Sequence, residues 1–169
     1  MTDLEARVAA LESEVRALQD RAEIQELRFR YHIAVNEKRP EEIRELFACD
    51  GRIDFGDLGR ASGPEQIDAF FARTLSDPAS FVKQFIHNHA IELDGDHARG
   101  LSYLEARTVV AGESVLVAAR YDDEYVREAG RWRFRKMTLV PIFIVPLREG
   151  WAGEKIMGQR SRRRAIEPA

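Results

Sequence analysis

The chain has 169 residues, of which 44% are hydrophobic, and no stretch rich in Pro, Gly or Ser divides it, so we expect one domain with a core of ordinary size. Its 26 Lys and Arg against 29 Asp and Glu give a formal net charge of -3, which excludes a global electrostatic field that gathers nucleic acid. A single cysteine, Cys49, excludes an intrachain disulfide and a zinc site built on several thiolates. The N-terminus lacks an apolar signal region and no apolar run is long enough to span a bilayer, so we expect a cytoplasmic protein with no membrane or nucleic-acid partner.

The first residues carry apolar side chains spaced alternately by four and three, which is the a/d seam of a coiled coil. These residues are Leu4, Val8, Leu11, Val15 and Leu18. Because the pattern lasts for less than three heptads, it fits equally well a coiled-coil arm and a helix that lies across its own domain. Either interpretation suggests self-association. We therefore predict an oligomerisation arm over residues 1–20, a main domain over 21–147 and a tail over 148–169, whose basic run at 160–164 is more typical of a solvated terminus than of a nucleic-acid site.

The order of the remaining elements predicts an α+β fold. Helical periodicity continues to Val35, Pro40 and Pro64 stand where two further helices begin, a short strand follows over 51–55, and residues 56–63 read as a loop. Beyond Phe81 the chain is rich in β-formers, with strands expected over 82–93, 98–110, 114–127 and 132–145. N-terminal helices followed by antiparallel strands predict helices packed on one face of a strongly curved antiparallel or mixed sheet, with a pocket between the two layers.

The most informative segment is 85–96. With the period of two of a strand, it places Phe85, His87, His89, Ile91 and Leu93 on one face, so that two imidazoles point toward the apolar side. A single core histidine is more often bonded to a backbone carbonyl, but two on one face, with Tyr31 in the domain, favour a site. Aspartates on either side of Gly95 predict a turn and an antiparallel hairpin.

The register of this hairpin suggests a partner for one of the histidines. Residues whose numbers sum to about 190 oppose each other, which sets Tyr103 across from His87 and Glu105 diagonal to it. Glu105 could orient His87, but the outward-facing strand charge is slightly favoured, because a buried carboxylate needs partners. Asp54 is a weaker candidate that suits nearby loop amides. A metal site on His87, His89 and Glu105 has little support, since two histidines on one strand are a weak pattern, and we expect no metal and no cofactor.

Several segments resemble the SnoaL-like superfamily, which shares the cone-shaped fold of nuclear transport factor two. The segments are 24–27 leading to Tyr31, 46–55, 91–96 and the closing hairpin 121–134, and the resemblance covers roughly residues 22–145. Within the superfamily the chain is most similar to the branch of bile-acid dehydratase, scytalone dehydratase and lindane dehydrochlorinase. The leading heptads of the bile-acid enzyme also resemble residues 4–18. The resemblance implies a cone-shaped single domain and a homotrimer.

In that branch the pocket holds a histidine base, an aspartate that orients it, and a tyrosine or lysine on the first helix. His87 matches the histidine and Tyr31 matches the tyrosine, whereas Asn36 stands at the aspartate position. An amide can fix the orientation of an imidazole but contributes no charge to its protonated form. The late-strand arginine of the branch has no match, because Met137 or Pro141 falls near its place.

The function implied by the resemblance is that of a cofactor-free lyase or isomerase, dehydratase-like, acting on a hydrophobic oxygenated small molecule such as a steroid, polyketide or aromatic compound. His87 would remove a proton alpha to a carbonyl, and Tyr31 would assist at the developing oxyanion or the departing hydroxyl. The alternative, which Asn36 favours, is a non-catalytic small-molecule-binding or assembly module of the same fold. The expected catalytic residues are Tyr31, Asn36, His87 and Glu105, and the expected substrate-binding residues are Phe55, Phe70, Tyr103, Met137 and Phe143.

Overall fold

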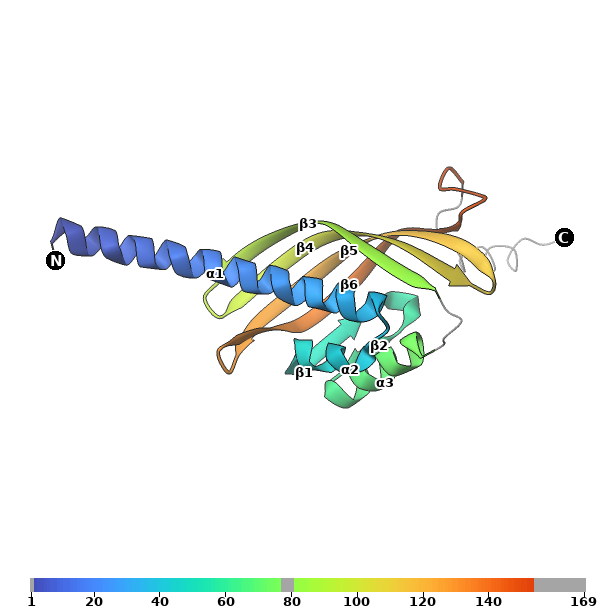
Figure 1. The fold of residues 1–169 in the computed structure, drawn as a ribbon, viewed down its shortest axis with the longest axis horizontal. Coiled ribbons are helices and arrows are strands. Elements are labelled where there is room, and N and C mark those ends of the chain that lie inside the picture. The colour runs from blue at the N-terminus through green and yellow to red at the C-terminus, as the bar shows by residue number, and fades with distance from the viewer. Residues whose placement is uncertain (1, 77–80, 154–169) are drawn as a thin grey trace, which may run out of the picture.

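A computed structural model describes residues 2–76 and 81–153 (Figure 1). The elements in chain order are α1 (Asp3–Asn36), α2 (Pro40–Ile43), a 3-10 turn (Arg44–Leu46), β1 (Phe47–Asp54), a second 3-10 turn (Gly56–Leu58), β2 (Arg60–Ser62), α3 (Pro64–Leu75), β3 (Val82–Asp94), β4 (His97–Val110), β5 (Glu113–Glu128) and β6 (Arg131–Pro146). The four long strands predicted from the sequence are confirmed to within one residue at each end. The segment 56–63, predicted as a loop, contains the short edge strand β2, which pairs with β1.

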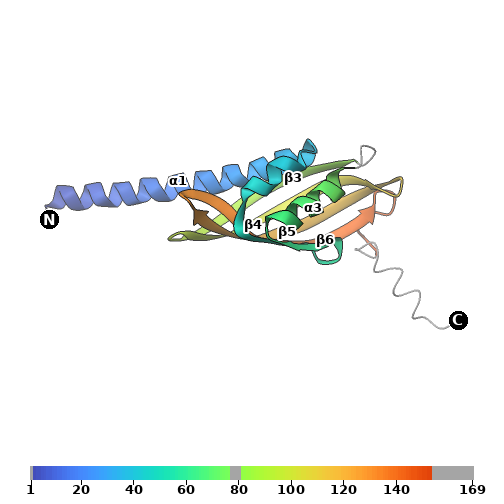
Figure 2. The same ribbon diagram turned by 90° about the horizontal axis from the view of Figure 1, so that it is seen from below.

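The strands form one mixed sheet in the order β2-β1-β6-β5-β4-β3. β1 runs parallel to β6, and the other neighbours are antiparallel. β1 begins at Phe47, earlier than predicted, because its first residue pairs with Phe134 of β6, a contact that local sequence patterns do not report. The helices lie on one face of the curved sheet, as Figures 1 and 2 show, so the α+β architecture is confirmed.

The core lies between the helices and the sheet, where aromatic rings from four elements meet. The Tyr31 ring of α1 makes edge-on contacts with Phe71 of α3, Tyr121 of β5 and Phe134 of β6, at centroid separations of 5.9, 6.2 and 6.1 Å. Edge-to-face pairs at such separations stabilise a core beyond the area that they bury. All four side chains are buried, so this cluster joins the helical layer to the centre of the sheet.

The first part of α1 extends beyond the sheet (Figure 1). Thr2 caps the helix in a capping box with Glu5, and residues 2–16 are all exposed. Contact with the sheet is made at Asp20, which accepts a hydrogen bond from Trp132 Nε1 at 3.1 Å and pairs with Arg127. The predicted seam of residues 4–18 therefore does not pack on its own domain, and its five apolar side chains are 45–69% exposed. No helix among the described residues is both long and apolar enough to cross a membrane.

Candidate functional site

A β-bulge in β3 decides which histidine faces the interior. Ile86 pairs with Leu104 and Asn88 with Tyr103, so that His87 is an extra residue with no partner across the ladder. An extra residue reverses the alternation of faces on its two sides. His89 consequently points inward as predicted, whereas the side chain of His87 is 54% exposed. The expectation that His87 faces the interior is wrong, because a strict period of two holds only for a strand without a bulge.

The predicted neighbours of His87 are present, but on the outer face of the sheet. Its Nε2 lies 3.7 Å from Glu105 Oε2, and the Glu105 side chain is also 54% exposed. Tyr103 is exposed as well. The expected register holds before the bulge, where Glu105 pairs with Phe85, and shifts by one residue after it, so that Tyr103 pairs with Asn88 rather than with His87. Glu105 has the alternative role of an outward-facing strand charge. Neither Glu105 nor Tyr103 can touch a ligand held between the helices and the sheet.

Asn36 binds the backbone of β3 rather than an imidazole. Its Nδ2 donates to the Gln84 carbonyl oxygen at 2.9 Å, and its Oδ1 accepts from the Gln84 backbone N–H at 2.7 Å. This paired contact joins the end of α1 to the edge strand of the sheet. The expectation that Asn36 orients His87 is therefore not met, since the two side chains have different neighbours.

Asn36→Asp is expected to lower the free energy of unfolding by about 1–3 kcal/mol, because a carboxylate can accept from the Gln84 N–H but cannot donate to its carbonyl. Lys83, whose Nζ bonds the Asn36 carbonyl oxygen, partly offsets the new charge. Chemical denaturation measures the loss. The chemical shifts of the His87 imidazole in solution NMR are expected to stay unchanged. Changed His87 shifts would show that the two side chains are neighbours.

The residues expected to line the pocket lie in different parts of the structure. Phe55, Phe70 and Met137 are buried in the core, where the Phe55 ring contacts Phe70 at 5.7 Å and Tyr121 at 6.2 Å between centroids. Phe143 lies elsewhere, stacked on Trp151 at 5.5 Å. Asp54 accepts from the Gly56 backbone N–H and from Arg60, in agreement with a role in the loop.

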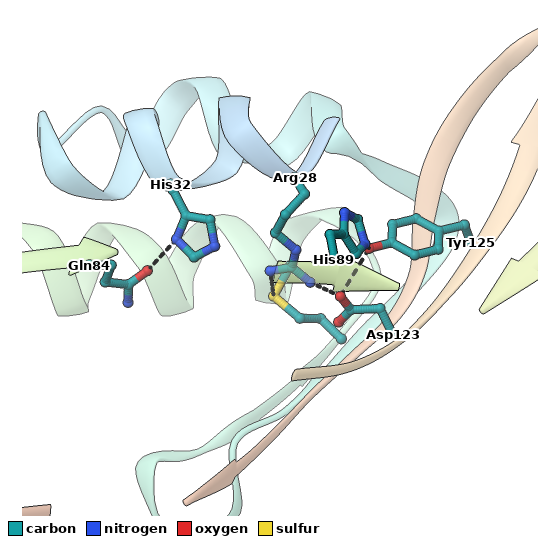
Figure 3. Close-up of polar contacts among 7 residues, drawn as sticks. Arg28, His32, Gln84, His89, Asp123 and Tyr125 are labelled. Carbon is teal, nitrogen blue, oxygen red and sulfur yellow. Dashed lines mark hydrogen bonds and ion pairs between the residues drawn. The ribbon is translucent and has the colours of Figure 1, made fainter. Parts of the chain in front are cut away.

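The interior holds a polar cluster that the sequence analysis did not identify (Figure 3). The interior polar cluster, as we name it, consists of Arg28 and His32 from α1, Gln84 and His89 from β3, and Asp123 and Tyr125 from β5. Its centre is the ion pair of Arg28 with Asp123, in which both side chains are fully buried. The sequence contains a pattern that could have indicated this cluster, because the helical periodicity places Arg28 and His32 on the same buried face of α1 as Ile24 and Val35.

Aromatic faces surround the Arg28 guanidinium. Its Cζ lies 4.4 Å from the ring centroid of Tyr121, 4.7 Å from that of Phe134 and 5.4 Å from that of Tyr31. The Nη1 atom also approaches the Met137 sulfur at 3.8 Å. Cation–π contacts gain strength when they are shielded from water. The cluster thus combines a permanent positive charge with apolar walls.

Both interior histidines are neutral at ordinary pH. His32 Nδ1 donates to Gln84 Oε1 at 2.9 Å, and His89 Nε2 lies 3.0 Å from the Tyr125 hydroxyl. Burial, followed by the nearby charge of Arg28, lowers the pKa of His32 to about 3 and that of His89 to about 4. Burial also raises the pKa of Tyr31 well above its ordinary value, so its hydroxyl keeps its proton.

Several buried polar atoms in this region have no hydrogen-bond partner among the described residues. They are Arg28 Nε, His32 Nε2, His89 Nδ1, Ser102 Oγ and Asp123 Oδ1. Buried polar groups in proteins are nearly always bonded, so a concentration of free donors and acceptors marks a place suited to a polar group of a ligand. The arrangement offers two unprotonated imidazole nitrogens and one permanently charged donor to the same region.

Two hollows in the described surface suit a hydrophobic ligand less well than the interior. Their volumes are about 490 and 460 Å³, and they share Glu92, Arg99 and Glu124 and are lined largely by charged side chains, although the first also reaches Tyr125 and the second Asp123. Within residues 2–76 and 81–153, no three His, Cys, Asp or Glu side chains are grouped so as to hold a metal ion. The interior polar cluster is therefore the candidate site.

Comparison with known proteins agrees with this architecture. The family described as the SnoaL-like domain matches residues 16–138. An uncharacterized protein of Mycobacterium tuberculosis is 28% identical over 123 residues, which cover 70% of this chain and 83% of that protein.

Solved structures show the same fold. The crystal structure of LinA is 25% identical with a TM-score of 0.74, covering 85% of this chain and 97% of the other. The hexachlorocyclohexane dehydrochlorinase LinA-type3 of Novosphingobium barchaimii is 23% identical with a TM-score of 0.73, covering 84% and 97%. A structure from Novosphingobium aromaticivorans named for scytalone dehydratase is 19% identical with a TM-score of 0.70, covering 77% and 89%. Because the family match spans most of the chain, this protein belongs to the SnoaL-like domain family.

Proposed function

We propose that this protein is a cofactor-free lyase or isomerase that acts on a hydrophobic oxygenated small molecule, such as a steroid, polyketide or aromatic compound, in the interior of the cone. The observation that carries the proposal is the interior polar cluster, with its free donor and acceptor atoms beside aromatic walls. The similarity to a dehydrochlorinase supports elimination chemistry, in which a base removes a proton from carbon and a leaving group departs.

The groups of the cluster suit proton abstraction next to a carbonyl. A neutral imidazole can accept the proton, and His32 and His89 each carry a nitrogen without a partner among the described residues. The free Nε–H of Arg28 can donate to the oxygen on which negative charge develops, a contact that gains strength in a dry site. Tyr31, which stays protonated, can assist at the leaving group or the oxyanion. No cofactor enters these steps.

A binding module of the same fold is the second candidate. Asn36 favours it, because the amide is bound to the backbone of β3 and no carboxylate on α1 supports an imidazole. Both functions require a ligand in the interior, and only the first requires turnover. Detection of product separates them.

A thermal-shift screen with hydrophobic ketones, alcohols and phenols tests the proposal. A compound present at one hundred times its dissociation constant adds about 2.7 kcal/mol of stability. Compounds that raise the melting temperature are then incubated with the protein and searched for product by mass spectrometry. A product supports the enzyme, and stabilisation without product supports the binding module. If no compound stabilises the protein, the interior is not a ligand site of this class.

We also propose that the protein is a homotrimer joined through the seam of α1. The five apolar side chains of the seam are exposed, whereas the later part of α1 buries one face against the sheet. Val8, Leu11 and Val15 lie next to one another on one exposed side of the helix, as expected of the seam of a coiled coil. A second and a third copy of this chain carry the same apolar seam, so the three helices can pack their seams against one another. The resembling branch also forms trimers.

Adding charge to the seam is expected to dissociate the trimer. The double variant Val8→Glu with Val15→Glu places two carboxylates at core positions of the coiled coil, where they would be buried without partners. The control, Ala6→Glu with Ser13→Glu, adds the same charge on the opposite face of the helix. Light scattering should give a trimer mass for the control and a smaller mass for the seam variant. A monomer mass for the unchanged chain would contradict the proposal.

A further inference from the structure

We infer that His89 Nδ1 is the proton acceptor of the interior site and that Tyr125, Asp123 and Gly100 are the residues that position it. The inference rests on the proposed function, because it assigns the base of that reaction. It also assigns a proton to one named nitrogen of His89, which can be tested without a substrate.

The hydrogen bonds determine the tautomer of His89. The Tyr125 hydroxyl donates to Asp123 Oδ2 at 3.0 Å, and the same oxygen pairs with Arg28 Nη2, which keeps the carboxylate ionised. A phenol has one proton, and Tyr125 uses it on Asp123. The contact of 3.0 Å between His89 Nε2 and the Tyr125 oxygen must then be donated by the imidazole. His89 therefore carries its proton on Nε2 and leaves Nδ1 as a free acceptor.

Gly100 on β4 leaves room for this contact. A Cβ atom at Gly100 would lie 2.8 Å from His89 Nε2 and 2.7 Å from Cε2 of the Tyr125 ring, both closer than real Cβ contacts. The backbone at this position does not require glycine, because its φ is outside the left-handed region. The absence of a side chain at Gly100 thus serves the contact between His89 and Tyr125.

His32 is less suited to be the base. Its Nδ1 donates to the neutral amide of Gln84, so its orientation depends on a flexible side chain that carries no charge. The hydrogen bonds of His89 end instead on Asp123, the carboxylate that also binds Arg28. Asp123 Oδ2 therefore positions both side chains: it binds Arg28 through Nη2, and it binds His89 through the hydroxyl of Tyr125.

The step that follows is a proton transfer within one substrate molecule. The C–H bond alpha to the substrate carbonyl breaks and its proton binds His89 Nδ1. The C–H electron pair forms a C=C bond and the π pair of the carbonyl moves to its oxygen, which accepts a hydrogen bond from Arg28 Nε. In a substrate with a β,γ C=C bond the product is a dienolate, and return of the proton from Nδ1 to its gamma carbon restores the carbonyl, shifts the C=C bond into conjugation and restores neutral His89, so no other reactant is consumed.

The experiment is nitrogen-15 NMR of the imidazoles in the full chain without ligand. We expect His89 in the Nε2–H form in the unchanged protein, and a mixture of tautomers in both Tyr125→Phe and Gly100→Ala, while His32 keeps the Nδ1–H form. His97→Gln, at the exposed first residue of β4, serves for assignment. His89 found with its proton on Nδ1, or unchanged in both variants, would overturn the inference. If Tyr125→Phe fails to fold, the tautomer in the unchanged protein decides.

A kinetic measurement separates this inference from the proposed function. With a substrate from the screen, Tyr125→Phe should lower kcat by at least about tenfold, a part of the 10²–10⁴ that general bases contribute, with little change in KM. If the role of Tyr125 were purely structural, Tyr125→Phe would lower the stability of the protein without lowering kcat selectively relative to KM. The expected tautomer in a protein that turns nothing over would refute the proposed function alone. Turnover by a protein whose His89 is the other tautomer would refute the inference alone.

Discussion

Asp123→Ala is expected to lower the free energy of unfolding by about 3–5 kcal/mol, the cost of leaving one member of a buried ion pair without its partner. Arg28 is fully buried, and a guanidinium does not lose its proton to avoid the cost. The remaining contacts, the Met137 sulfur and the aromatic faces, do not replace a carboxylate. Tyr125 would lose its acceptor as well. Urea denaturation at constant m value measures the loss.

Two controls show whether burial causes the effect. In the double variant Arg28→Met with Asp123→Leu both charges are removed, and much of the lost stability should return, because apolar pairs often replace buried ion pairs without cost. Asp68→Ala breaks the exposed pair of Asp68 with Arg44, and its cost should stay below about 1 kcal/mol. If Asp123→Ala costs no more than Asp68→Ala, the interior pair is solvated and the candidate site is open to water.

The largest expected effect on activity is that of His89→Gln, a fall in kcat/KM of about 10²–10⁴-fold on a substrate found in the screen. Glutamine approximates the size of the imidazole but cannot accept a proton from carbon. The same substitution at His87 decides between the two placements of the base. His87 lies on the outer face, so activity should be lost in His89→Gln and retained in His87→Gln. A loss in His87→Gln with activity retained in His89→Gln would show that the reaction takes place on the outer face.

The pH profile provides a second measurement on the same substrate. Burial lowers the pKa of His89 to about 4, so the imidazole keeps its free lone pair in neutral and mildly acidic solution. Protonation abolishes the base, and activity is lost as the pH falls through the pKa. The acidic limb of kcat/KM should therefore lie near pH 4 rather than near the value of about 6.5 typical of an exposed histidine. Circular dichroism along the series confirms that the fold persists.

Local patterns in the sequence determined the elements of this protein and the turn that joins β3 to β4. Periodicities of 3.6 and 2 and the turn at Gly95 depend on neighbours in the chain, and these features agree with the structure. The resemblance to SnoaL-like proteins predicted the fold for the same reason, because it rests on the order of the elements. The burial of Tyr31 follows from helical spacing alone.

Only the tertiary structure decided which side chains of β3 meet in the interior. The bulge at His87 arises from the fit of β3 to β4 on a curved sheet, and no local signal announces that one extra residue exchanges the faces on either side. Arg28 and Asp123 are 95 residues apart, and each alone reads as a solvated charge. A charge is stable in a core only when its partner is present, so the site became recognisable when the fold brought the two together.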